Sequence, residues 1–308
     1  MTVTAAATQP AAQLAPLGAA RIPFTKVTLT ASADGDVTVN GLVVERTGQS
    51  VDAAIDGVIL LDENGMQLGI AKTLNSSHQA TLTESFMVKA GQSRTMTLAV
   101  NRPTSGTSAH AGMVAALSLV QVNTSATVNG SFPISGTAQT INEGLTIGSV
   151  TMNRGALDPG TTATKEVGVT GYTFSSIRVT AGSAENIRLR SLKWNESGSV
   201  SASDLANVKT YVDGTAYDTV QSGDYYTASF GSGIVIEKGF NKEISIKGDI
   251  IGGSSRTTAF DIAKRTDLDV GGELYGYGIT PPQTNTCAAT TGTACFTSAE
   301  DPWYDGAV

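Results

Sequence analysis

The chain has few of the residues on which most enzymes depend. It contains only two histidines, His78 and His110, and two cysteines. Both histidines occur in polar or glycine-containing stretches of the first half, and no Gly-x-Ser-x-Gly nucleophile elbow is present. Nucleophilic catalysis needs a base held beside a nucleophile and an orienting group. We therefore expect both histidines to lie in loops or on the surface, and we predict that the protein is not an enzyme.

Charge is also scarce. Charged residues make up 15% of the 308 residues and the net charge is −7, whereas an average soluble domain has roughly 25% charged residues. There is no basic cluster or arginine–aromatic platform, so we expect no nucleic-acid partner. No apolar run reaches the length of about 18 residues that a membrane span needs. A low-charge composition rich in Gly, Ser and Thr is common in secreted β proteins, which predicts an extracellular location.

The two cysteines, Cys287 and Cys295, are eight residues apart in a stretch of small residues. This spacing predicts a local disulfide, which would contribute about 2–3 kcal/mol by closing a short loop. The alternative is a pair of free thiols, which the exported composition disfavours. The pair has no histidine nearby in the sequence, so we do not expect a metal site there.

What the chain does have is an internal repeat, because residues 27–98 recur at 177–246. Apolar alternation and glycines return with an offset of 150: Val37, Val39, Leu42, Val44 and Gly48 become Ile187, Leu189, Leu192, Trp194 and Gly198. Beyond Phe86 the offset is 148. Polar groups that could perform chemistry do not recur. A duplicated scaffold without a duplicated site is typical of a structural or binding array.

Most of the chain alternates between apolar and polar residues with period two, as half-buried strands do. Gly, Asn and Asp turn signals separate these short runs. The sequence therefore predicts an all-β protein with two tandem antiparallel immunoglobulin-like β-sandwich domains. Short helical turns are expected at residues 50–55 and 201–205, where Ser and Asp precede apolar residues.

We place the first β-sandwich repeat at residues 1–140 and the second at 141–280, with residues 144–150 as its first strand. Residues 281–308 read as an extended tail or the start of a further module. The chain begins partway into a repeat unit, in what should be the first strand of that unit. We therefore expect the chain to be a segment of a longer exported polypeptide or a processed form of one. Residues 1–10 would then offer a strand for contact with a neighbouring chain or a neighbouring domain.

Four acidic residues lie in oxygen-rich turns, namely Asp34, Asp36, Asp62 and Glu63. Carboxylate and carbonyl oxygens are the ligands that Ca²⁺ prefers, so calcium is the cofactor we consider here. The EF-hand spacing is never completed. Aspartate is also favoured in turns for backbone hydrogen bonding, and that reading stays open for these residues and for any pair of glycosidase carboxylates.

Aromatic residues are sparse but gather in the second repeat. Tyr211, Tyr217, Tyr225 and Tyr226 lie close in sequence, with Phe230 following. Such a group could stack against sugars and bind surface glycans. The alternative is that they form ordinary cross-strand pairs. The first repeat has no matching aromatics, so a sugar site would belong to the second repeat alone.

Four segments carry a resemblance to a known class of proteins: residues 58–65, 157–162, 172–185 and 204–214. They resemble the large repetitive cell-surface proteins of Patescibacteria, the candidate phyla radiation bacteria. The resemblance covers about residues 1–280. It implies a long exported protein with β-sandwich repeats that forms a surface layer or another extracellular coat, and it implies no catalytic residues.

Together these observations predict a structural subunit of an extracellular surface layer or filament in the cell envelope. Copies of the chain would self-assemble through contacts between β-sandwich domains, helped by low surface charge that limits self-repulsion. The alternative is an adhesin or carbohydrate-binding module, and a third possibility is the accessory domains of a secreted hydrolase.

Overall fold

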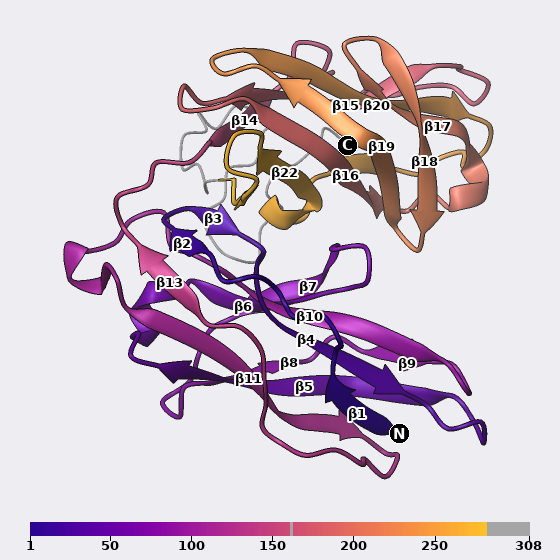
Figure 1. Ribbon diagram of the computed structural model, residues 1–308. Helices are drawn as coiled ribbons and strands as arrows, with labels where there is room; N and C mark the ends of the chain where they lie inside the picture. The colour runs from indigo at the N-terminus through magenta and orange to yellow at the C-terminus, as the bar shows by residue number, and fades with distance from the viewer. Residues whose placement is uncertain (161–162, 282–308) are drawn as a thin grey trace. The chain divides into compact units, whose positions relative to one another are not determined.

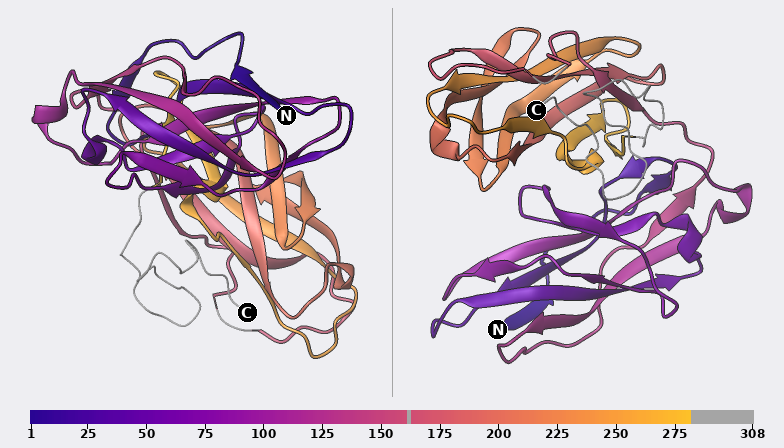
Figure 2. Two further views of the ribbon diagram at one scale, coloured as in Figure 1. Left: turned by 90° about the horizontal axis from the view of Figure 1, so that it is seen from below. Right: turned by 180° about the vertical axis from the view of Figure 1, so that it is seen from behind.

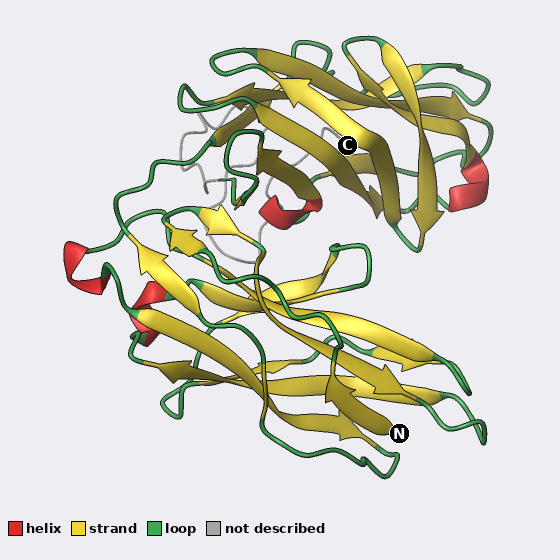
Figure 3. Cartoon of the chain, in the orientation of Figure 1, coloured by secondary structure: helices red, strands yellow, loops and turns green. Residues whose placement is uncertain are grey.

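The computed structural model describes residues 1–160 and 163–281, which form two β-sandwich units (Figure 1). Unit 1 is Met1–Ile147 and unit 2 is Gly148–Val308. The predicted all-β sandwich fold is confirmed, and the helical segments are short 3-10 turns (Figure 3). None of the described residues belongs to a helix that is long and apolar enough to span a membrane.

Unit 1 consists of two layers, which Figure 2 shows from two further sides. One sheet has the order β1 (Thr2–Ala5), β4 (Ile22–Thr30), β10 (Ser93–Asn101), β6 (Gly57–Leu61) and β7 (Gln67–Lys72). The other has the order β2 (Leu14–Pro16), β13 (Gln139–Asn142), β11 (Val114–Thr124), β5 (Val37–Gly48) and β8 (Gln79–Leu82), with β12 (Ile134–Ser135) on β11 and β9 (Phe86–Val88) on β5. The remaining elements are β3 (Ala19–Ala20), η1 (Asp52–Ala54) and η2 (Ser108–His110). Strand β2 is parallel to β13, whereas the other pairs of unit 1 strands are antiparallel.

Unit 2 repeats the strand order of the first sheet of unit 1, but its second layer differs. Its first layer has the order β14 (Val150–Arg154), β15 (Tyr172–Ala181), β20 (Asn241–Ile250), β17 (Leu205–Val212) and β18 (Thr215–Ser222). Its second layer has the order β19 (Tyr225–Ile236), β16 (Ile187–Gly198), β22 (Leu268–Gly272) and β23 (Gly278–Ile279), with β21 (Thr258–Asp261) also on β16. The helical turns are η3 (Ala202–Asp204) and η4 (Arg265–Asp267). Strand β18 pairs with both β17 and β19, so it joins the two layers.

The repeated sequence folds into equivalent elements. Strands β5 and β16 span the same positions 150 residues apart, and so do η1 and η3. The sheet order β1-β4-β10-β6-β7 matches β14-β15-β20-β17-β18. The repeated glycines Gly48 and Gly198 both have positive φ, and a Cβ on either would collide with the backbone of the adjacent strand. Only glycine fits at this point, where the long strand ends against its neighbour.

The cores form from the alternating side chains that the sequence indicated. Val27 and Leu29 of β4 are fully buried, as are Ile177 and Val179 of β15. Among the described residues, Trp194 is the bulkiest fully buried side chain, and its Nε1 donates to Thr210 Oγ1 at 3.0 Å.

Two predictions about segment boundaries differ from the structure. The division between the units follows Ile147 rather than residue 140, and strand β14 begins at Val150 rather than at residue 144. The reason is local, because Asn142 Oδ1 accepts hydrogen bonds from the backbone N–H groups of Gly144 and Leu145. This turn ends β13 and delays the next strand.

The first strand is built into its own unit. Val3 pairs with Leu29 of β4 on one side. On the other side Val3 N–H donates to Asn129 O at 2.9 Å, and Asn129 N–H donates to Met1 O at 2.9 Å. Strand β1 is therefore paired within its own unit, and the expected contact of residues 1–10 with a neighbouring chain or domain stays a prediction.

Candidate functional site

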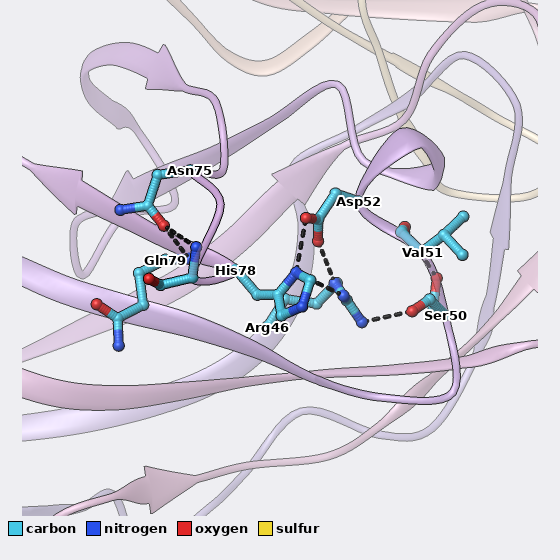
Figure 4. A network of polar contacts seen from close by, with 8 residues as sticks. Arg46, Ser50, Val51, Asp52, Asn75, His78 and Gln79 are labelled. Carbon is cyan, nitrogen blue, oxygen red and sulfur yellow. Dashed lines mark hydrogen bonds and ion pairs between the residues drawn. The ribbon is translucent and has the colours of Figure 1, made fainter.

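A network of charged and polar side chains in unit 1 joins β5, η1 and the turn before β8 (Figure 4). Arg46 is nearly buried, and its Nε donates to Asp52 Oδ1 at 2.5 Å while its Nη1 donates to the Ser50 carbonyl oxygen at 2.5 Å. His78 Nδ1 lies 2.7 Å from Asp52 Oδ2 and 3.1 Å from Arg46 Nη2. We call Arg46, Asp52 and His78 the unit 1 clip.

The local sequence explains where His78 stands. Asn75 Oδ1 accepts hydrogen bonds from the N–H groups of Ser77 at 2.9 Å and Gln79 at 3.0 Å, which closes a tight turn. His78 adopts a left-handed φ of 59° in this turn, and its carbonyl oxygen accepts a bond from Arg46 N–H at 2.8 Å. The ring is about half exposed and faces Asp52.

The clip favours ionised Asp52. Burial raises the pKa of Asp52, but hydrogen bonds from His78 and Arg46 outweigh this effect, so the pKa lies below its usual range. Ser50 contributes its carbonyl oxygen to Arg46, and its hydroxyl donates to the Val51 carbonyl oxygen at 3.4 Å. The contacts of Arg46, Asp52 and His78 hold η1 against β5 and the turn before β8, which stabilises this part of unit 1.

Unit 2 has different chemistry at the equivalent place. Glu196 N–H donates to Asp224 O at 2.7 Å, as Arg46 N–H does to His78 O in unit 1. Burial raises the pKa of Glu196, the hydrogen bond from Thr258 partly opposes this, and the charge of Asp224 adds to the rise. The backbone contact is thus repeated, but the basic residues Arg46 and His78 are replaced by the acidic residues Glu196 and Asp224.

One member of the first pair of calcium candidates, Asp36, is bound to a loop from a distant part of the chain. Asp36 accepts hydrogen bonds from Lys89 Nζ and from Ala90 N–H, each at 2.8 Å. These two bonds hold the pKa of Asp36 below its usual range. Asp34 is exposed in the same turn.

The second pair is engaged in the same manner. Asp62 Oδ1 accepts bonds from the N–H groups of Asn64 at 2.9 Å and Met66 at 2.8 Å. Both oxygens of Glu63 accept from Arg94, at 2.7 and 2.8 Å. Within residues 1–160 and 163–281, no group of three or more His, Cys, Asp or Glu residues could hold a metal ion. The structure therefore lends the calcium prediction no support.

The tyrosines do not share one face. Tyr226 is only 5% exposed, with its ring centroid 5.3 Å from that of Phe260. Tyr217 packs edge-to-face on Phe230 at 5.0 Å and belongs to the border of the core. Tyr226 is therefore a core residue, and the prediction that it stacks against glycans is wrong, whereas Tyr217 is only partly buried. Adjacent residues on a strand point to opposite faces, which is why neighbouring tyrosines separate.

The other two tyrosines, Tyr211 and Tyr225, are half-buried. The Lys247 ammonium lies 5.0 Å from the centroid of the Tyr211 ring, where it interacts with the π-face. His110 is half-buried in η2, apart from the clip. The predicted disulfide between Cys287 and Cys295 lies outside the described residues.

Sequence reasoning missed a buried arginine that closes one end of unit 1. Arg102 Nε donates to the Ala15 carbonyl oxygen at 3.0 Å, and Nη2 donates to Glu143 Oε1 at 2.7 Å. Its Nη1 donates to the Ala54 carbonyl oxygen. The repeat offset of 148 places Ile250 at this position in unit 2. Aligning the two repeats would have revealed this residue, because unit 1 has an arginine, Arg102, where unit 2 has an isoleucine, Ile250.

Sequence reasoning also missed a groove at the equivalent end of unit 2. Its volume is about 690 Å³, and it lies between residues 163–167 and 252–258. Phe174, Leu205 and Ile250 line its apolar part. The size lies within the range of sites that bind ligands or peptide segments, which is roughly 300–1,000 Å³.

Comparisons with known proteins add little. No protein-family model matches the chain, and no curated protein sequence matches it. Among solved structures, the class 5 fimbriae chaperone CfaA is 10% identical, with 82% of this chain and 96% of that chain covered and a TM-score of 0.19. A membrane-anchored protein from Corynebacterium diphtheriae is 11% identical over 92% of this chain and 57% of its own, with a TM-score of 0.18. An anti-sigma factor domain-containing protein from Clostridium clariflavum is 11% identical over 83% of each chain, with a TM-score of 0.17. Similarities this low do not indicate a function.

Proposed function

We propose that the protein is a structural subunit of an extracellular surface layer or filament that assembles from copies of itself. The observation that carries this proposal is the nature of the repeat. Units 1 and 2 share the strand order of one sheet, the helical turns η1 and η3, and core positions such as those of β4 and β15. They do not share the unit 1 clip, whose place in unit 2 holds Glu196 and Asp224.

The use of the polar side chains supports a scaffold role. Carboxylates that could have bound a metal or acted on a sugar accept hydrogen bonds from turns, as Asp62 does, or from arginines, as Glu63 does. These carboxylates therefore hold loops in place. The low charge of the chain keeps repulsion between neighbouring copies small, and the resemblance to repetitive cell-surface proteins agrees with this role.

Electron microscopy of the negatively stained full-length chain, together with sedimentation velocity over a range of concentrations, tests the proposal. We expect ordered sheets or filaments in the images and larger species as the concentration rises. Raising the ionic strength should not abolish assembly, because low surface charge leaves few long-range attractions to screen. A chain that stays dispersed and monomeric at every concentration would refute the proposal.

A further inference from the structure

One short strand closes the end of unit 1. Strand β13 lies between β11 and β2, with Ala115 paired to Gln139 on one side and Leu14 paired to Thr140 on the other. Its inward side chains are buried, because Gln139 is 0% and Ile141 is 1% exposed. In the chain, β13 follows β12, which pairs with the same edge of β11. Unit 1 is therefore closed by the segment that continues along this edge.

Unit 2 contains the counterpart of the first neighbour of β13. Gly198 of β16 pairs with Thr258 of β21, as Gly48 of β5 pairs with Ala115 of β11. Thr258 thus occupies the place of Ala115, whose outer edge pairs with β13. Among the described residues, no strand pairs with the outer edge of β21.

Unit 2 also contains the counterpart of the second neighbour, β2. Ile250 N–H donates to Val169 O at 2.8 Å, as Arg102 N–H does to Ala19 O at 2.8 Å. This bond places residues 163–167 where unit 1 has β2. Residues 163–167 are exposed and form no strand. They therefore lack the cover that β13 gives to β2.

The groove of about 690 Å³ lies between these two counterparts. Residues 163–167 line one side and Thr258 lines the other, and Phe174, Leu205 and Ile250 form its apolar part. An uncovered strand edge invites pairing with other chains, and native proteins usually cover such an edge. The groove therefore has the apolar floor and the backbone edge that a closing strand needs.

The backbone of β21 is oriented to accept a strand. Ser199 N–H donates to Thr257 O at 2.8 Å, which makes this a bonded position of the β16–β21 ladder. In an antiparallel ladder, the N–H and C=O of the next residue point away from the partner strand. The Thr258 N–H and C=O therefore face the groove, whereas the Ala259 N–H faces β16.

The end of the described chain leads toward this edge. Strands β21 and β22 follow one another along β16, and β23 pairs with the edge of β22 that faces away from β16. Because β23 runs antiparallel to β22, a chain that continues beyond Ile279 in the same direction passes along the outer edge of β21. Thr280 and Pro281 are buried, so the chain is still packed on unit 2 at this point.

The strand registers identify the segment that would reach the groove. Val270 pairs with Leu189 on one side and with Ile279 on the other. Thr258 pairs with Gly198. Leu189 and Gly198 are nine residues apart and the bulge of β16 takes up one of them, so eight ladder positions separate Val270 from Thr258. An extended chain that continues eight residues beyond Ile279 comes level with Thr258 at residue 287.

We propose that residues 284–291 of the same chain fill this groove as the strand that closes unit 2. Cys287 would pair with Thr258, and Ala289 would lie over the apolar floor, as Ile141 does in unit 1. The inference goes beyond the proposed function, because a chain closes its own unit whether or not copies assemble.

The composition of this segment suits the groove. Residues 283–299 contain no charged residue and are mostly threonine and alanine. The two cationic side chains beside the groove already have partners, because Arg256 Nη1 is 2.6 Å from Asp204 Oδ2 and the Lys165 ammonium is 5.1 Å from the Tyr172 ring centroid. An acidic strand would find both cations engaged, whereas an uncharged strand needs neither.

Tethering favours this segment over a strand from any other molecule. It begins three residues after Pro281, so its effective concentration at the groove is on the order of millimolar. Unit 1 shows the same economy of connection, because three residues separate the end of β12 at Ser135 from the start of β13 at Gln139. The segment that follows β23 is therefore the occupant that the described residues favour.

Hydrogen–deuterium exchange mass spectrometry with single-residue fragmentation tests the inference on the full chain. The Thr258 N–H faces the groove, so it should exchange slowly only when a strand accepts its hydrogen bond. Cys287→Pro removes the N–H that would donate to the Thr258 carbonyl oxygen, and we expect it to speed exchange at Thr258 by about tenfold. Cys287→Ala is the matched control, because it also loses the thiol but keeps the N–H.

Ala259 is the internal reference in every sample. Its N–H faces β16, so slow exchange at Ala259 shows that unit 2 is folded. A chain that ends at Pro281 lacks the whole segment, and there too we expect fast exchange at Thr258 beside slow exchange at Ala259. All samples are measured at two protein concentrations, because protection by the chain's own segment does not depend on concentration.

Slow exchange at Thr258 in the full chain that is lost in Cys287→Pro and kept in Cys287→Ala supports the proposal. If Thr258 in the full chain exchanges as fast as an exposed amide, or stays slow in the chain that ends at Pro281, the inference is overturned. Protection that grows with concentration would identify a second copy as the occupant and would also overturn it. If only the shortened chain exposes Thr258, the occupant is correct and the pairing of Cys287 with Thr258 is wrong.

Discussion

Replacing Arg102 with alanine tests whether the buried ion pair holds the end of unit 1 together. The Arg102 side chain is 0% exposed and that of Glu143 is 7% exposed, and the two are 2.7 Å apart. Arg102→Ala removes this bond and the bonds to two backbone carbonyl oxygens, of Ala15 and Ala54. It leaves the Glu143 carboxylate buried without its partner. We expect a loss of about 3–5 kcal/mol, which is a large part of the roughly 5–15 kcal/mol that stabilises a typical domain.

Urea denaturation followed by far-ultraviolet circular dichroism measures this loss as a lower midpoint at an unchanged m value. The double variant Arg102→Ile, Glu143→Leu gives unit 1 the isoleucine that unit 2 has at Ile250, and it should recover most of the stability, since it removes both charges. Lys89→Ala breaks an exposed pair with Asp36 and serves as the control, with no measurable shift of the midpoint. A loss below about 1 kcal/mol for Arg102→Ala, or a double variant no more stable than the single one, would refute the reasoning.

Three further predictions concern single side chains. Asp52→Asn should cost about 1 kcal/mol at neutral pH, because it weakens the bonds from Arg46 and His78. The pKa of folded Asp52 is lowered, so this stability is present above the unfolded pKa and is lost as the pH falls through the folded pKa. A cost of Asp52→Asn that persists in acid would contradict the assignment. Glu196→Gln should stabilise the protein at neutral pH and have no effect in acid. Burial raises the pKa of Glu196 in the folded protein, so the folded state disfavours its ionised form. Thermal unfolding as a function of pH checks the sign of this stability difference. Trp194→Phe should cost about 2–4 kcal/mol in urea denaturation, since it leaves a cavity and removes the indole N–H that donates to the buried Thr210 Oγ1; a cost near zero would mean that the core of unit 2 repacks freely.

The sequence predicted much of the fold because the fold rests on local patterns. Period-two alternation identified the strands β5 and β16, and the offset of 150 residues placed them at equivalent positions in two units. The repeated glycines Gly48 and Gly198 marked the strand ends, where no side chain fits. Ser201 and Asp204 cap η3 as expected, whereas η1 has Val51 at its N-cap and was found through its place in the repeat. These features depend on near neighbours in the chain, which a sequence displays directly.

The candidate site was less predictable because it depends on which strands meet. The clip brings Arg46 to His78 from 32 residues away, and nothing in the spacing of the two residues signals this contact. The aromatic cluster failed as a platform for a related reason. Tyr225 and Tyr226 are adjacent, so the pleat of β19 turns one of them into the core, and the register of the strand decides which one.

By itself, the sequence determined that the protein is all-β, that it is a duplication, and that the core and turns are what the two halves share. The tertiary structure decided how each half is closed. In unit 1 the parallel pairing of β2 and β13 buries Ile141 and is sealed by Arg102, whereas unit 2 has Ile250 and an open groove at the same place. Period-two alternation shows that a residue lies on a strand, but not whether another strand lies beside it. That depends on backbone pairing between segments more than 100 residues apart, which side-chain patterns do not encode.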